Sequence, residues 1–122
     1  MDLREFEALI SDSLEEMPPA IQEMLDNVAV VARHFPTREQ LQDNKLSNKY
    51  ELLGLYEGVP LTERDSTYSM VLPDRITLFK EPIEAVCDSR EAMAEQVRHT
   101  VKHELAHHFG ISDEQLEEMG RY

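Results

Sequence analysis

One segment near the carboxyl end, residues 88–110, constrains the fold more than any other part of the chain. Asp88, followed three residues later by Glu91, has the pattern of a capping box, and Gly110 is typical of a helix C-terminus. Between these ends, apolar side chains recur every four residues, which places them on one face of an α-helix. They are Met93, Val97, Val101 and Leu105. The segment therefore predicts a long helix whose apolar face is buried in a core.

Shorter elements precede this helix. An amphipathic helix is expected over residues 2–15, and Pro19 can open a second short helix after it. The run NVAVVARHF (27–35) predicts a buried strand, and LLGLYEGVPL (52–61) and RITLF (75–79) predict further strands.

Polar segments connect these elements. Thr37 with Gln40, and Ser112 with Gln115, have the spacing of capping boxes and predict two more short helices. The polar residues 62–70 are expected to form a loop. The pattern predicts an α+β fold, in which a small mixed β-sheet packs against several helices.

Length and composition limit the architecture. The chain has 122 residues, of which 41% are hydrophobic, and this suits a single domain over residues 1–122. There is no apolar run of the length that a membrane helix needs, and the acidic start, MDLREFEALISD, is unlike a secretory signal. Cys87 is the only cysteine, which is compatible with a reducing, cytoplasmic location.

The charge is strongly negative and restricts the partners. Acidic residues number 25 and basic residues 12, a formal net charge of −13. Nucleic acids and acidic membranes bind clustered Lys and Arg, so neither is an expected partner. The same field favours cationic partners and metal cations, although much of it is the charge of a solvated surface.

The predicted long helix contains the motif H-E-x-x-H. His103 and His107 are four residues apart, so both imidazoles project from one face, away from the apolar stripe. Two neutral imidazoles one turn apart can each offer a ring nitrogen to one zinc ion. Glu104 lies at the edge of that face, where its carboxylate can accept a proton from water without being a ligand. The motif predicts a metal site, against the alternative of a solvent-facing histidine pair at a helix end.

A catalytic zinc ion commonly has three protein ligands, and four nearby residues are candidates for the third. His99 lies one turn earlier, and three side chains spread over two turns converge poorly on one ion. His108 points away from the metal-binding face and is expected to pack at the helix end. Asp113 and Glu114 follow Gly110, where the chain can reverse toward the metal. We favour Asp113, because Glu114 better fits the acidic residues common in the first turn of a helix.

The chain resembles the zincin-like metallopeptidases, and more closely a family of small bacterial zincin-like proteins. The similar segments are DNVAVVARHFPT, LLGLYEGVPLTER, PDRITLF and CDSREAMAEQVRHTVKHELAHHFGISDEQLEEMG, of which the last is the most specific. The resemblance implies a minimal zincin fold. It also implies one Zn²⁺ ion held by His103, His107 and Asp113, with Glu104 as the catalytic acid/base. Asp113 stands where metzincins have a third histidine.

We therefore expect a zinc-dependent metallopeptidase that acts on a peptide or protein substrate. The substrate could pair with an edge strand, either LLGLYEG or RITLF. Tyr56, Tyr68 and His99 are candidate donors to the transition state. The alternative is a metal-binding module that lacks proteolytic activity and serves protein interaction. A purely structural zinc ion would need a fourth ligand, and the sequence offers no obvious one.

Overall fold

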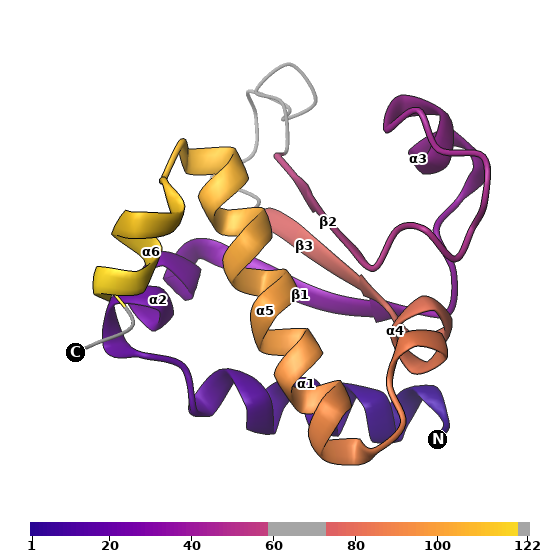
Figure 1. The fold of residues 1–122 in the computed structure, drawn as a ribbon, viewed down its shortest axis with the longest axis horizontal. Helices are drawn as coiled ribbons and strands as arrows, with labels where there is room; N and C mark the ends of the chain where they lie inside the picture. The colour runs from indigo at the N-terminus through magenta and orange to yellow at the C-terminus, as the bar shows by residue number, and fades with distance from the viewer. Residues whose placement is uncertain (59–72, 120–122) are drawn as a thin grey trace, which may run out of the picture.

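The described residues of this computed structural model are 1–58 and 73–119, apart from the side chain of Met119 (Figure 1). Tyr68, the predicted loop 62–70 and the end of the LLGLYEGVPL segment lie outside them. The elements in chain order are α1 (Leu3–Glu15), α2 (Pro19–Met24), the 3₁₀ helix η1 (Leu25–Asn27), β1 (Val28–Arg33), α3 (Arg38–Asp43), β2 (Gly54–Glu57), β3 (Asp74–Phe79), α4 (Lys80–Val86), α5 (Arg90–Phe109) and α6 (Asp113–Met119). The predicted α+β class, a small mixed sheet with several helices, is confirmed.

The three strands form one sheet in the order β1-β3-β2. β1 runs parallel to β3, with Val30 opposite Ile76, and β2 runs antiparallel to β3, with Tyr56 opposite Ile76. The sequence prediction for RITLF as an edge strand is wrong, because β3 is the central strand and pairs on both sides. NVAVVARHF forms an edge strand that is mostly half-buried, not a buried strand. Of the two proposed edge strands, β2 is therefore the one at an edge.

The helices α1 and α5 pack against one face of the sheet (Figure 1). Ile76 and Leu78 of β3 point to this face and are fully buried in the same core cluster as Phe6 of α1 and Val97 of α5. Gly54 also points to this face, since a Cβ there would lie 2.6 Å from Cγ2 of Thr100 in α5. This close approach sets the position of α5 over β2.

Helix α5 has the predicted apolar face and the predicted end. Met93, Val97, Val101 and Leu105 are all buried. Gly110 ends the helix with φ 67° and ψ 33°, the left-handed conformation that glycine adopts without strain. None of the helices in the described part of the chain is both long enough and apolar enough to cross a membrane.

The helix caps are predicted correctly in two of three cases. Thr37 with Gln40 forms a capping box, and Ser112 with Gln115 forms a second one. The start of α5 differs from the prediction by one residue. Its N-cap is Ser89, whose Oγ accepts a hydrogen bond from the Ala92 N–H at 3.0 Å, and not Asp88. Both residues are good N-caps, so composition alone could not decide between them.

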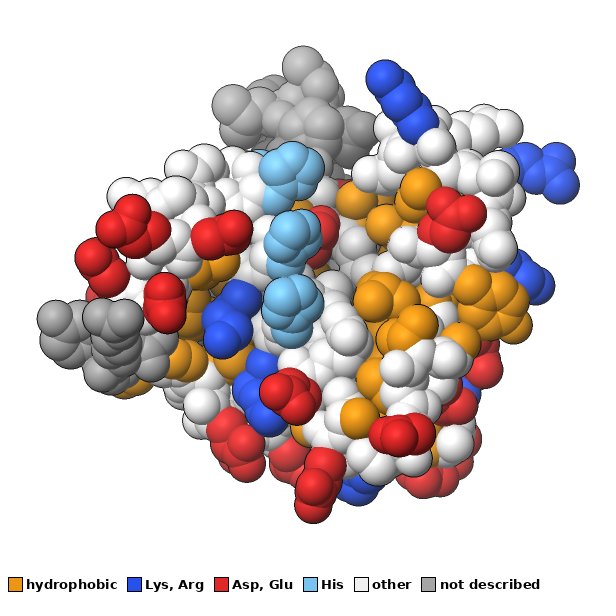
Figure 2. Space-filling model, in the orientation of Figure 1, with side chains coloured by type: hydrophobic (Ala, Val, Ile, Leu, Met, Phe, Trp, Pro, Cys, Tyr) orange, Lys and Arg blue, Asp and Glu red, His pale blue; other side chains and the backbone are white. Residues whose placement is uncertain are grey.

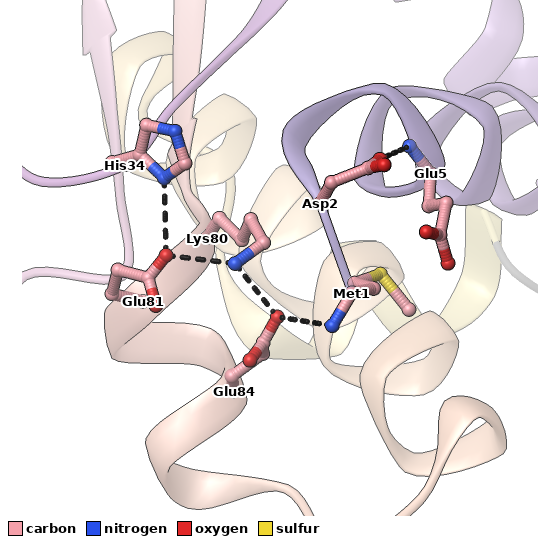
Figure 3. Close-up of polar contacts among 7 residues, drawn as sticks. All are labelled: Met1, Asp2, Glu5, His34, Lys80, Glu81 and Glu84. Carbon is pink, nitrogen blue, oxygen red and sulfur yellow. Dashed lines mark hydrogen bonds and ion pairs between the residues drawn. The ribbon is translucent and has the colours of Figure 1, made fainter.

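A group of ion pairs joins α4 to two other parts of the chain (Figure 3). The buried Lys80 ammonium lies 2.7 Å from Glu81 Oε2 and 2.9 Å from Glu84 Oε1. Glu81 Oε2 also lies 3.0 Å from Nδ1 of His34, and Glu84 Oε1 lies 3.5 Å from the amino group of Met1. The group links the beginning of α1, the end of β1 and the β3–α4 junction.

Candidate metal centre

A cleft of about 570 Å³ lies between α5 and β2. Three residues predicted for the site, His103, Glu104 and His107, line it together. The other lining residues are Asn44, Leu52, Gly54, Leu55, Tyr56 and His108. Histidine side chains form a column along α5 on the face shown in Figure 2. A second hollow of about 480 Å³, between α1, α2 and β1, is lined by apolar, acidic and neutral polar side chains, and none of its lining residues is histidine or cysteine.

The two motif histidines occupy the accessible side of α5. His103 and His107 are both exposed, whereas Val101 and Leu105, two residues before each of them, are fully buried. The same helix therefore anchors its apolar face in the core and presents both imidazoles to the cleft. This part of the sequence prediction concerned the direction of the side chains, and it is confirmed.

Glu104 is held in place by the edge strand. Its Oε1 accepts a hydrogen bond of 2.9 Å from the backbone N–H of Tyr56 in β2. The carboxylate is half-buried, between the exposed histidines and the strand. A backbone donor cannot rotate away as a side chain can, so this contact restricts the orientation of the carboxylate. Because the Tyr56 N–H already donates to Glu104, a peptide that lies along β2 cannot form a hydrogen bond with this backbone donor.

Tyr56 lines the cleft, but its hydroxyl group already has a partner. The hydroxyl donates a hydrogen bond of 2.7 Å to Asp74 Oδ2. Burial, and then the hydrogen bond and negative charge of Asp74, raise the pKa of Tyr56 to about 12. A phenol has one proton to donate, so Tyr56 can serve as a transition-state donor only by giving up this bond.

His108, which the sequence analysis set aside as a ligand, also lies at the cleft. It is exposed and lines the cleft, and its ring stacks on Tyr56 with centroids 3.9 Å apart and an interplanar angle of 18°. Its ring packs at the helix end as expected, but it packs on Tyr56 and therefore at the cleft. The signal was present in the spacing, because His108 follows Glu104 by four residues and shares its side of the helix.

Of the four candidates for the third ligand, Asp113 and Glu114 do not form a metal-binding group with the histidines. Asp113 and Glu114 are exposed in the first turn of α6. Among the residues that the structure describes, no group of three or more His, Cys, Asp or Glu side chains is arranged to hold a metal ion. The assignment of His103, His107 and Asp113 as a ligand set therefore stays a prediction.

Comparison with known families points to the same part of the chain. A family model described as zincin-like metallopeptidase matches residues 25–121. The chain belongs to this family. The matched range contains the whole sheet and α5, and thus every residue that lines the cleft. Among curated proteins, none matches the chain.

The side chains at the cleft of this zincin-like chain carry the types of donor atom that zinc binds. Two exposed imidazoles, one helical turn apart, face a cleft that also contains a carboxylate fixed beside them. Imidazole nitrogen and carboxylate oxygen are ligands that zinc accepts readily, and family membership implies zinc binding.

Proposed function

We propose that the chain is a zinc-dependent metallopeptidase that hydrolyses a peptide bond in a peptide or protein substrate. The observation that carries the proposal is the placement of Glu104. Its carboxylate is held by the Tyr56 backbone N–H beside two exposed imidazoles, in a cleft large enough for a peptide segment. Membership of the zincin-like metallopeptidase family supports the same reaction class.

The proposed roles follow from the positions of the side chains. His103 and His107, with Asp113 as the third ligand, would hold one Zn²⁺ ion. When bound, zinc would supply Lewis-acid activation of water and of the scissile carbonyl. Glu104 would accept the proton of the attacking water and transfer it to the leaving amine. Oε2 is the oxygen proposed for this transfer, because Oε1 already accepts the bond from Tyr56.

The apolar side of the cleft suggests how a substrate is oriented. Leu52 and Leu55 line it together with the histidines, so an apolar side chain of the substrate would be buried there. The outer edge of β2 lies beside them, and its backbone groups other than the Tyr56 N–H could bind the substrate backbone. This arrangement requires the peptide to be extended across the cleft.

The decisive variant is Glu104→Gln. Glutamine keeps an oxygen that can accept the bond from Tyr56, but it cannot act as a general base. Zinc content should equal that of the wild type, while cleavage of a diverse peptide library should fall by about 10²–10⁴-fold. Glu95→Gln, which neutralises an exposed carboxylate on the same helix, should leave both unchanged. Full zinc content with no detectable hydrolysis by the wild type would favour the binding module instead.

The third ligand is tested by a matched pair of exposed carboxylates in α6. Asp113→Ala should weaken zinc affinity by at least about tenfold, because it removes a ligand and not a more distant contact. Glu114→Ala changes the charge of the same helix turn by the same amount and should have little effect. Competition with a chromophoric chelator measures both affinities. A larger loss for Glu114→Ala would reverse the assignment.

A further inference from the structure

His99 stands outside the cleft but in contact with the proposed site. It is exposed, and its ring stacks on that of His103 with centroids 6.1 Å apart and an interplanar angle of 17°. The two residues are four positions apart on α5, as are His103 and His107. We refer to His99 and His103 as the outer pair, and to His103 and His107 as the motif pair. The column of histidines in Figure 2 runs along this helix.

The outer pair is close to the geometry of a two-imidazole metal site. With Zn–N bonds of about 2.0–2.1 Å and tetrahedral angles, two ligating imidazoles have ring centres about 5 Å apart. The observed separation is 6.1 Å, so a closure of about 1 Å is needed, within the reach of rotamer adjustments in two exposed side chains. The helical spacing already brings both rings to the same side.

The two imidazoles of the outer pair favour one class of metal ion. Neutral imidazole is a good ligand for Zn²⁺, Ni²⁺ and Cu²⁺, and a poor one for Mg²⁺ and Ca²⁺. Water can complete the coordination, because both side chains are exposed. The net charge of −13 raises the local concentration of divalent cations.

We propose that the outer pair is a second binding site for a divalent transition-metal ion and that it competes with the motif pair. The competition follows from His103, which belongs to both pairs. A neutral imidazole has one nitrogen with a free lone pair, so His103 can ligate only one of the two ions at a time. An ion on the outer pair therefore withdraws His103 from the motif pair.

Metal binding by two variants tests the outer pair without any peptidase assay. His107→Ala removes the motif pair and keeps the outer pair. The double variant His99→Ala/His107→Ala removes both and keeps His103. All these side chains are exposed, and circular dichroism checks that both variants fold. Calorimetric titration with Zn²⁺ alone should give one ion bound by His107→Ala, with an affinity at least about tenfold higher than in the double variant.

Imidazole NMR signals identify the ligands directly. Adding Ni²⁺ to His107→Ala should broaden the ring signals of His99 and His103 together, while those of His34, which directly follows β1 and contacts Glu81, stay sharp. Equal zinc affinity in the single and double variants, or broadening of His103 without His99, would overturn the proposal.

The proposal of a second metal site and the proposed peptidase activity can fail independently of each other. If His107→Ala and the double variant bind zinc equally while Glu104→Gln loses cleavage, the outer pair is refuted and the peptidase stands. If the outer pair binds but the wild type hydrolyses no peptide, the peptidase proposal fails alone. If both hold, one equivalent of zinc is divided between the two pairs, so His99→Ala loaded with one equivalent should hydrolyse peptide faster than the wild type.

Discussion

Tyr56 combines three contacts at the cleft in a single residue. Its backbone N–H holds Glu104, its ring stacks on His108, and its hydroxyl group donates to Asp74. Only the first of these contacts is independent of the side chain. A substitution at this position can therefore disturb His108 and Asp74 while the contact with Glu104 persists.

Tyr56→Phe separates the hydroxyl group from the ring. The variant loses the bond to Asp74 and should be destabilised by about 1–2 kcal/mol at neutral pH. The folded state raises the pKa of Tyr56 from its ordinary value to about 12. The resulting stabilisation is fully present below about pH 10 and is lost as pH rises through 12. Urea unfolding from pH 8 to 12 should show this alkaline loss in the wild type but not in Tyr56→Phe.

Tyr50→Phe is the control for general alkaline effects, because its ring is 45% exposed on the loop before β2. It should follow the wild type over the whole pH range. If Tyr56→Phe has the same alkaline profile as the wild type, the raised pKa of Tyr56 is not the source of the alkaline loss of stability.

Among the contacts between secondary-structure elements, the one between α5 and β2 decides the shape of the cleft. Gly54 makes the contact possible, because its missing side chain leaves room for Thr100 of the helix. Two residues further along β2, Tyr56 reaches Glu104 one turn further along α5. The strand and the helix thus meet at two successive contacts, and the second of them holds the Glu104 carboxylate.

Gly54→Ala should push the helix and the strand apart. The new Cβ would lie 2.6 Å from Thr100 Cγ2 and 3.2 Å from the backbone oxygen of Thr77, and the latter cannot move aside. We expect a loss of about 1–3 kcal/mol in unfolding free energy, together with weaker protection of the Tyr56 amide against hydrogen exchange.

Gly58→Ala is the matched control, because it adds the same methyl group just after the same strand. Its Cβ would have ordinary contacts, the nearest being Asp74 Oδ1 at 3.6 Å, so its effect should stay within about 0.5 kcal/mol. Equal effects of the two substitutions would show that the close approach at Gly54 is not what holds β2 to α5.

For the molecule as a whole, the ion pairs around Lys80 connect segments that are far apart in sequence. Hydrogen bonds from Lys80 and then from His34 lower the pKa of Glu81. Burial alone would lower the pKa of Lys80, but its bonds to Glu81 and Glu84 raise it. Lys80 and Glu81 therefore each favour the charged form of the other.

Lys80→Met should remove the centre of this group while keeping most of the side-chain volume. The two carboxylates would lose their shared cation, at a cost of about 1–3 kcal/mol, moderated because each is 30% exposed. The lowered pKa of Glu81 contributes stability above its ordinary pKa, and this is lost as pH falls through the lower folded-state value. Thermal unfolding between pH 7 and 3 should therefore show a smaller acid-induced loss in Lys80→Met. The exposed Lys45→Met is the control and should follow the wild type.

Sequence reasoning succeeded where neighbouring residues decide the structure. The apolar stripe of α5, its end at Gly110 and two capping boxes depend on side chains within a few positions of one another, so their spacing predicts them. It failed where contacts between segments that are distant in the sequence decide the structure. The central position of β3, the half-buried state of β1 and the stacking of His108 on Tyr56 depend on contacts across the sheet and the cleft.

The sequence by itself determined that His103, Glu104 and His107 would lie on the accessible side of a buried helix. The reason is local, because the helical period fixes which side chains share a face. Only the tertiary structure decided that β2 is the strand beside that face, that its backbone holds Glu104, and that His108 lines the cleft. These contacts join residues up to 52 positions apart, and no local periodicity encodes which backbone donor a distant carboxylate will meet.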